Sequence, residues 1–286
     1  MAQSKTAKAL IVICSVIVVA FFVSIIRGVT RPVGAKIAVV EIEGMISDSK
    51  EAMKNIVKFK EDDSIRGIIL RINSPGGAVG PTQEIYREVI KLKEKKPVYV
   101  SMGSLCASGG YYIASAGQRI YANPSTVTGS IGVIMQLAML EGLIEKLGIQ
   151  MTTIKAGAFK DAGTPFREMT KEERAYFNSV VESIHAQFIK DVAAGRKMEV
   201  EKIRKLADGR VFTGTQAKEL GLVDGLGNFY DTVDEFKKVL KISGKPNLVY
   251  AEKPFSFSKW LIGSLARDLV NERFSSPFKF LFSPQQ

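Results

Sequence analysis

The chain has 286 residues, of which 46% are hydrophobic and 24% charged, so it can form one large globular domain or two small ones. The formal net charge is +11, but no dense block of Lys and Arg alternates with aromatic residues, so we expect no nucleic-acid partner. The single histidine, His185, excludes histidine-rich metal sites, and a Ser-His-Asp triad would have to use it. The two cysteines, Cys14 and Cys106, lie in dissimilar segments, which argues against a disulfide framework.

The first predicted element is an apolar helix. Residues 9–26 carry no charge, and this run is long enough to span a bilayer. No A-x-A cleavage site follows directly, so we expect an uncleaved anchor, with a cleaved signal peptide as the alternative. Basic residues flank the run on both sides, so charge does not settle its orientation. We therefore divide the chain into an anchor and linker (1–35), a domain (36–250) and an aromatic tail (251–286). The tail could be a membrane-surface helix, a segment packed on another subunit, a flexible peptide or a helix completing the core.

From Lys36 onward, β-branched runs alternate with amphipathic segments. Strands are predicted at residues 37–42, 66–72, 97–102, 120–122, 151–154 and within 208–214, and a glycine-serine turn at 128–134 leads into another strand. Helices are predicted at residues 49–60, 82–93, 140–147, 200–206, 215–220 and 229–240, with a long helix opening at the capping box of Thr170. Repeated strand–turn–helix units predict an α/β fold with parallel strands. In such folds, sites lie at glycine-rich turns after strands.

One such turn contains Ser108. The segment 104–112, SLCASGGYY, joins a predicted strand to a predicted helix. A serine at the start of a helix lies where free N–H groups gather, which suits a nucleophile. The alternative is an N-cap serine followed by glycines that permit close packing.

A second turn, Ser74–Gly77, also follows a buried strand. It has neither the P-loop spacing nor the dinucleotide-binding spacing. Successive free N–H groups there could hold an oxyanion, with Gly77 and Gly109 as the donors. A plain tight turn is the alternative.

A serine nucleophile needs a base. His185 falls beside the apolar face of the long helix, so we interpret it as a boundary residue. A lysine acts as a base only where burial lowers its pKa toward neutrality. Lys155 and Lys160 are the two lysines that lie away from polar helix faces. Lys160 is slightly favoured because Phe159 could desolvate it, although Asp161 would act in the opposite sense if it pointed inward.

The chain resembles the signal-peptide peptidase A family in its short, single-repeat form. The matching motifs are NSPGG (73–77), ASGGYY (107–112), NPST (123–126), TGSIGV (128–133), Lys160 ahead of REMT (167–170), GTQA (214–217) and GLVD (221–224). They cover roughly residues 36 to 240. The resemblance implies an α/β fold of the ClpP/crotonase type preceded by one transmembrane helix. It also implies that Ser108 is the nucleophile, Lys160 the general base and Ser130 the hydroxyl that orients the lysine. Gly77 and Gly109 would supply the oxyanion hole.

The same resemblance implies how the protein assembles and where it acts. In the family, serine and lysine of one site come from adjacent catalytic domains, and the short forms are octameric rings. The anchor would be single-pass, with a cytoplasmic N-terminus and a periplasmic or extracellular catalytic domain. The expected substrates are cleaved signal peptides and other extended apolar peptides, and no cofactor or metal is expected. Two alternatives remain: a membrane-bound scaffold without turnover, and a crotonase-like acyl-CoA enzyme.

Overall fold

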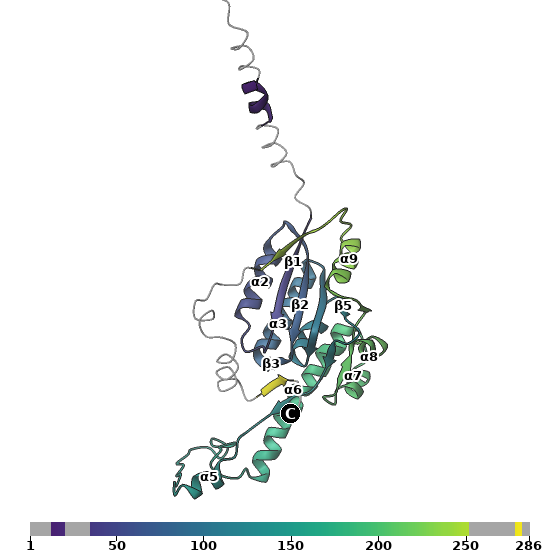
Figure 1. Cartoon of the computed structure of the whole chain (residues 1–286). Coiled ribbons are helices and arrows are strands. Elements are labelled where there is room, and N and C mark those ends of the chain that lie inside the picture. Colours follow the sequence, from purple (N-terminus) through teal and green to yellow (C-terminus); the bar gives the residue numbers. More distant parts are fainter. Residues whose placement is uncertain (1–12, 21–34, 252–277, 282–286) are drawn as a thin grey trace, which may run out of the picture.

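The computed structural model describes residues 13–20, 35–251 and 278–281. The body of the protein is a twisted sheet in the order β10-β1-β2-β4-β5-β9, with β6 and β8 attached through β4 (Figure 1). The strands are β1 (Lys36–Glu43), β2 (Ile65–Ser74), β3 (Gly76–Ala78), β4 (Val98–Ala107), β5 (Arg119–Ala122), β6 (Val127–Gly129), β7 (Ile134–Met135), β8 (Val211–Thr213), β9 (Gly225–Leu226), β10 (Asn247–Tyr250) and β11 (Phe278–Leu281). Along the main path every neighbouring pair is parallel, which confirms the predicted α/β architecture.

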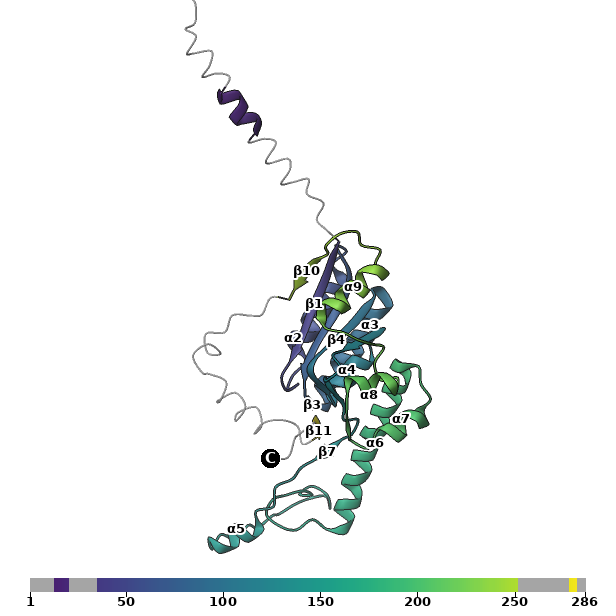
Figure 2. The same ribbon diagram turned by 45° about the vertical axis from the view of Figure 1, so that its right-hand side comes forward.

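Helices cover both faces of this sheet (Figure 2). They are α2 (Lys50–Glu61), α3 (Val79–Lys95), α4 (Gly109–Ser115), α5 (Glu141–Lys146), α6 (Lys171–Arg196), α7 (Val200–Leu206), α8 (Gly214–Glu219) and α9 (Phe229–Val239). Side chains alternate between the two faces of a strand, so β2 contributes to two cores. Ile68 and Leu70 join the larger core, which includes residues of α3, α4 and α6, whereas Ile69 packs with Phe236 of α9 on the opposite face.

Most predicted elements are confirmed, but three differ. β4 continues to Ala107 and α4 begins at Gly109, so the strand extends into the first part of the segment 104–112 and the turn is confined to Ser108. The strand expected after the glycine-serine turn is mostly displaced, since β6 precedes Ser130 and only the two residues of β7 follow. Residues 151–154 are exposed and form no strand. A β-branched run therefore stays irregular where no neighbouring strand is present to pair with it.

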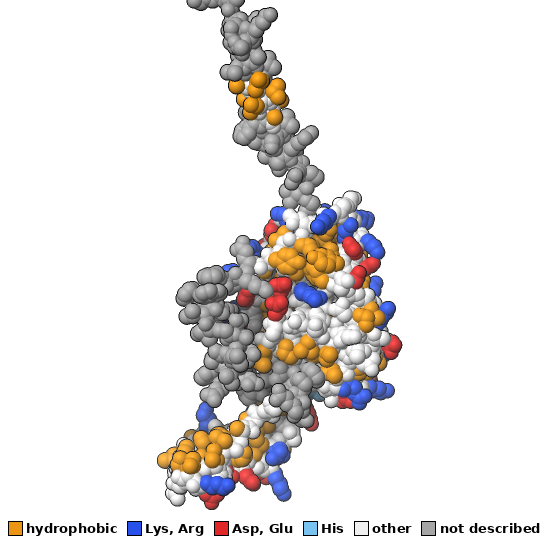
Figure 3. Space-filling view, in the orientation of Figure 1, with side chains coloured by type: hydrophobic (Ala, Val, Ile, Leu, Met, Phe, Trp, Pro, Cys, Tyr) orange, Lys and Arg blue, Asp and Glu red, His pale blue; other side chains and the backbone are white. Residues whose placement is uncertain are grey.

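The segment of residues 136–170, which we call the arm, projects away from the sheet together with the first turns of α6. Both ribbon views show α5 at its far end (Figures 1 and 2). Apolar side chains gather on its surface (Figure 3). Those exposed to solvent are Leu137, Met139, Leu140, Leu143, Leu147, Ile149, Met151, Ile154, Phe159 and Phe166. A patch of this extent on a single chain is typical of an interaction surface.

The long helix α6 confirms the capping box at Thr170, whose hydroxyl accepts the Glu173 N–H. Its predicted apolar face is only partly buried. Phe188 and Val192 are in the core, whereas Phe177 and Val181, nearer the arm, remain half-buried.

The predicted anchor, residues 9–26, lies mostly outside the described residues. Residues 13–20 are helical and their apolar side chains are exposed. Within residues 13–20, 35–251 and 278–281, no helix combines the length and apolarity that crossing a bilayer requires. The aromatic tail is also outside the described residues, apart from Ala251 and β11.

Candidate active site

Ser108 occupies a strained position between β4 and α4. Its backbone has φ 53° and ψ −119°, a conformation that non-glycine residues seldom adopt. The side chain is 1% exposed, and its Oγ is a buried atom without a hydrogen-bond partner among the described residues. The hydroxyl makes no capping bond to α4, so the N-cap alternative is not supported. Strain and an unsatisfied buried hydroxyl both cost free energy, and such features concentrate at functional sites.

The glycine turn after β2 is held by Ser74. The Ser74 hydroxyl donates to the Gly44 carbonyl over 2.6 Å and accepts the Gly76 N–H over 3.1 Å. Gly76 has φ 100°, which glycine adopts at little cost. Ile46 then bridges the turn, because its N–H donates to the Gly76 carbonyl and its own carbonyl accepts the Ala78 N–H. Hydrogen bonds from the Ser74 side chain and the Ile46 backbone therefore fix the turn along one edge of β3.

Gly77 and Gly109 lie close together beside Ser108. A Cβ built on Gly109 would be 3.3 Å from the Gly77 nitrogen and 2.8 Å from the Thr82 hydroxyl. A Cβ on Gly77 would be 2.1 Å from the Ile46 carbonyl oxygen, closer than any side chain allows. Both positions therefore require glycine, and the predicted oxyanion donors are neighbours in space. Two adjacent N–H groups next to a buried hydroxyl suit an oxyanion hole.

Ser130 lies next to Ser108. Ala107 on β4 is paired with Gly129 on β6, and each serine directly follows its half of that pair. The Ser108 N–H donates to the Gly129 carbonyl over 2.8 Å. Ser130 is buried and has φ 51°. Of the predicted site residues, the structure therefore brings Ser108, Ser130, Gly77 and Gly109 together.

Two buried tyrosines fix the helix that follows Ser108. The Tyr111 hydroxyl donates to the Leu222 carbonyl over 2.9 Å, and the Tyr112 hydroxyl donates to the Asp191 carboxylate. Tyr112 also packs on the Phe188 ring of α6. Burial raises the pKa of both tyrosines far above the usual range. They remain neutral hydrogen-bond donors and anchor α4 to the rest of the core.

Lys160 lies in the arm, in an exposed loop beside the start of α6. Its neighbour Phe159 packs against Tyr176, with ring centroids 5.3 Å apart. Within the described residues, Lys160 Nζ makes no hydrogen bond or ion pair. It is not buried within this chain.

The rest of the loop is held by an ion-pair network that does not include Lys160. Lys155 pairs with Asp161, whose other contact is Arg167 at 3.0 Å. Arg167 also donates to Glu173 at the N-terminus of α6 over 3.0 Å. Hydrogen bonds from Arg167 and then Lys155 lower the pKa of Asp161 from 3.8 to about 2. Since Asp161 is bound by Arg167 and Lys155, its carboxylate is not available to Lys160.

His185 stays at the edge of the core on α6. Its Nε2 and the Ser108 Oγ both lack a partner among the described residues, so no Ser–His hydrogen bond is formed there. This agrees with the prediction that His185 is a boundary residue.

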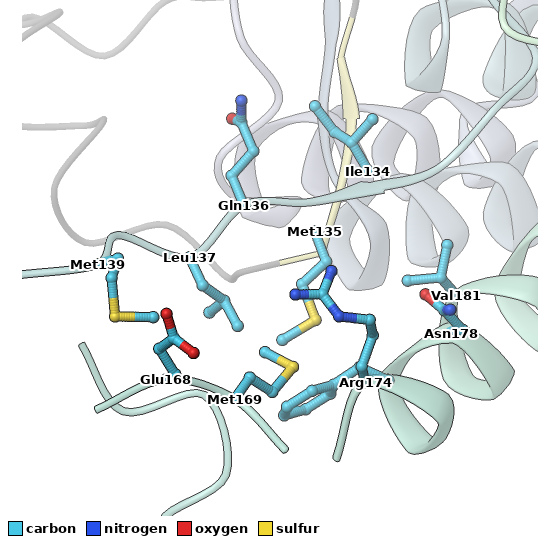
Figure 4. A pocket seen from close by; sticks show the side chains of 11 residues that line it. Ile134, Met135, Gln136, Leu137, Met139, Glu168, Met169, Arg174, Asn178 and Val181 are labelled. Atoms are coloured by element: carbon cyan, nitrogen blue, oxygen red, sulfur yellow. The ribbon is translucent and has the colours of Figure 1, made fainter. Parts of the chain in front are cut away.

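A pocket of about 670 Å³ lies between β7, the arm and α6. Figure 4 shows Met135, Leu137 and Met169 converging on its centre, with Glu168 and Arg174 beside them. Residues 140–167 separate its two walls along the chain, so no local sequence pattern indicates this pocket. It is suited to flexible apolar ligand groups, since methionine adapts to irregular shapes.

Comparison with known proteins identifies the family. The profile of Peptidase family S49 matches residues 90–243, more than half of the chain. The chain belongs to peptidase family S49, the family of signal-peptide peptidase A. This S49 peptidase is 45% identical to "Putative protease slr0021" of Synechocystis sp. over 68% of its own chain and 71% of that protein. It is 36% identical to "Putative signal peptide peptidase SppA" of Enterococcus faecium over 81% of its chain and 72% of that protein. It is 33% identical to "Protease 4" of Haemophilus influenzae over 72% of its chain but only 35% of that longer protein.

The S49 peptidase is therefore a serine peptidase, a hydrolase that acts on peptides. The profile includes the segments that carry Ser108, Ser130 and Lys160 but begins after the glycine turn of Gly77.

Proposed function

We propose that this chain is a membrane-anchored serine endopeptidase whose nucleophile is Ser108 and whose general base is Lys160 of a neighbouring copy. The observation that carries the proposal is Ser108 itself. Its buried, unpartnered hydroxyl lies in a strained turn next to the N–H groups of Gly77 and Gly109. A hydroxyl in this state is ready to attack a carbonyl group whose oxygen those two N–H groups receive.

The position of Lys160 supports a site shared between two copies. The lysine belongs to an exposed apolar arm, whereas Ser108 lies within the body of the chain. A lysine is neutral, and thus basic, only in a desolvated setting. Packing of the apolar arm on another copy would provide that setting and cover the exposed side chains. A ring in which each copy offers its arm to the next closes this head-to-tail contact, and the family resemblance suggests eight copies.

The reaction would be acyl transfer. Neutral Lys160 accepts the Ser108 proton as Oγ attacks the peptide carbonyl carbon, and the N–H groups of Gly77 and Gly109 hold the oxyanion. Lys160 then gives the proton to the leaving amine. Water, activated by the same lysine, releases the acyl group and restores Ser108. Ser130, one strand away from Ser108, would hold the lysine in place.

Several features support extended apolar peptides, including cleaved signal peptides, as substrates. The Met-lined pocket beside β7 suits apolar side chains. An uncleaved anchor at residues 9–26 would hold the ClpP/crotonase-type domain, residues 36–250, at the outer face of the cytoplasmic membrane, near such peptides. We infer this location from the sequence and the family resemblance.

Mixing two inactive variants tests the proposal. Ser108→Ala and Lys160→Ala should each fail to hydrolyse an apolar reporter peptide, whereas Lys146→Ala, on the arm helix α5, should remain active. Rings assembled from both inactive variants should recover about one quarter of wild-type activity, because one site in four then joins an intact serine to an intact lysine. No recovery in rings proven to be mixed contradicts a shared site. An inactive wild type favours the scaffold, and a fully active Ser108→Ala favours a crotonase-like enzyme.

A further inference from the structure

A pocket of about 440 Å³ lies at the opposite end of α4 from Ser108. Its walls include the last turns of α3 and α6 and the residues that join α4 to β5. Ser108 directly precedes α4, whereas Gly117 and Arg119, which line the pocket, follow the end of that helix. The pocket is therefore separate from the predicted active site.

The pocket carries an excess of positive charge. Its cationic lining residues are Lys93, Arg119, Arg196 and Lys197, and among its described residues only Asp224 is acidic. Arg196 donates to the Asp224 carboxylate over 2.9 Å, and its side chain is only 6% exposed, so this pair is complete. Arg119 lies 3.8 Å from the other carboxylate oxygen, beyond hydrogen-bond distance. The pocket therefore keeps the charges of Lys93, Arg119 and Lys197 after this pairing.

Lys93 and Lys197 have no partner of opposite charge within the described part of the chain. Neither Nζ makes a hydrogen bond or an ion pair there, although Lys93 is half-buried. Burial, followed by the charge of Lys197, lowers the pKa of Lys93. Two like charges held near each other in a pocket repel, and an anion bound between them would relieve both that repulsion and the cost of burial.

The dipole of helix α3 does not account for Lys93. Cations are favoured at the C-terminus of a helix, where they usually remain in water. Lys95, in the same last turn, has that role, because it is exposed and its Nζ lies 3.2 Å from Glu61. Lys93 instead lines a pocket next to a second lysine. A bound anion explains this placement better than the helix dipole alone.

The walls of the pocket are fixed by close packing. A Cβ built on Gly195 would be 2.1 Å from the Ser115 carbonyl oxygen, so the ends of α4 and α6 are in contact. Arg196 also donates to the Gly221 carbonyl over 3.2 Å, which joins α6 to the loop before β9. Walls that are already ordered reduce the entropy cost of binding a small ligand.

We propose that this pocket binds a phosphate group through Lys93, Lys197 and Arg119. A phosphate group presents several acceptor oxygens and up to two negative charges, so it can contact all three cations at once. Free phosphate or pyrophosphate is one source of this group. A lipid headgroup is the other, because Arg119 and Lys36 begin parallel strands at the same edge of the sheet, and Lys36 leads back to the predicted anchor. The inference does not depend on Ser108 as nucleophile.

Calorimetric titration of the full chain with pyrophosphate, in a maltoside detergent that contains no phosphate, tests the site. Wild type should bind, whereas Lys93→Met and Lys197→Met should each bind about tenfold more weakly, because each loses one charge-assisted hydrogen bond. Lys54→Met removes an exposed lysine of α2 that does not line the pocket, so it is the matched control and should bind like wild type. Wild-type affinity in both pocket variants, or an equal loss in Lys54→Met, overturns the site.

Melting temperatures distinguish the two sources. For free phosphate, pyrophosphate at a hundredfold excess over Kd should raise the melting temperature by about 5 °C in pure detergent. For a lipid headgroup, the rise should require phosphatidylglycerol in the micelles. In either case the rise should be absent from Lys93→Met and kept in Lys54→Met. No rise with either ligand, or an equal rise in Lys93→Met, overturns the proposal.

The stability of Lys93→Met without phosphate separates a ligand-binding lysine from one that supports the fold. This variant should then melt at a higher temperature than wild type, because methionine replaces a half-buried charge by an apolar group of similar length. A lower melting temperature would show that Lys93 has a stabilising partner in the chain, which contradicts the site.

Discussion

Ser108 and Ser130 directly follow the paired ends of two neighbouring strands, β4 and β6. Each follows one member of the Ala107–Gly129 register pair, and their φ angles are 53° and 51°. Of the four non-glycine residues with positive φ in the described part of the chain, these two are buried. Holding two neighbouring buried serines in a strained backbone conformation costs free energy, and this strain is associated with placing both hydroxyls at one site.

Replacing Ser108 by alanine should abolish activity without loss of stability. Peptide hydrolysis should fall by a factor on the order of 10³ or more, as for other serine nucleophiles. Because the Ser108 hydroxyl is buried without a partner, its removal should leave the free energy of unfolding unchanged or raise it by about 1 kcal/mol. Kinetic assays and denaturant titration measure the two effects.

Ser115→Ala is the matched control for this change. Ser115 is equally buried, but its hydroxyl donates to the Tyr112 carbonyl over 2.7 Å. Loss of this hydrogen bond should lower the free energy of unfolding by about 1 kcal/mol, and the variant should keep most of its peptidase activity. If Ser108→Ala destabilises the protein as much as Ser115→Ala does, the Ser108 hydroxyl has a structural role.

Adding a methyl group at Gly77 should damage both the site and the fold. The new Cβ would meet the Ile46 carbonyl oxygen at 2.1 Å, so β3 would have to move. We expect activity to be lost and the melting temperature to fall. Gly80→Ala is the control, since no atom lies within 4 Å of its Cβ position in the first turn of α3. Equal melting temperatures for the two variants would contradict the close approach of Ile46.

The ion-pair network of the arm should weaken in acid. The pKa of Asp161 is lowered from 3.8 to about 2, so its stabilising effect is complete above pH 3.8 and lost as pH falls toward 2. Pepsin, which is active in this range, should therefore cleave the arm faster at pH 2 than at pH 4. Arg167→Gln removes the main partner of Asp161, so its cleavage should be fast throughout. A wild-type cleavage rate that does not change over this range contradicts the role of the network.

Cys106 should be unreactive although it lies two residues from Ser108. The side chain is fully buried, and burial raises the pKa of its thiol far above the usual range. A Cys14→Ser variant leaves Cys106 as the sole thiol. Iodoacetamide should neither label nor inhibit this folded variant at pH 8, and labelling should appear in denaturant. Inhibition with modification of Cys106 would instead indicate a cysteine near the reacting groups.

The sequence correctly predicted the elements whose formation depends on residues close together in the chain. The continuous apolar run of β2 and the capping box at Thr170 were found because burial and helix initiation leave short-range signatures. The end of β4 was misplaced because its last residues pair with β6, more than twenty positions away. β3 and β11 are separated by about 200 residues, and no local pattern reports that pairing.

The choice between Lys155 and Lys160 was open for a similar reason. Both lysines are in the same loop, and the sequence does not tell which one Asp161 contacts. The structure gives that contact to Lys155 and leaves Lys160 without an ion pair among the described residues. Its base role remains a prediction until mixed rings are measured.

The central claim is that Ser108 is the nucleophile, and a covalent adduct tests it most directly. An apolar peptide diphenyl phosphonate should modify the full chain at one serine. Tryptic mass spectrometry should place the adduct on Ser108, with labelling retained in Cys14→Ser and lost in Ser108→Ala. An adduct on Ser130 or another serine, or equal labelling of Ser108→Ala, would contradict the account.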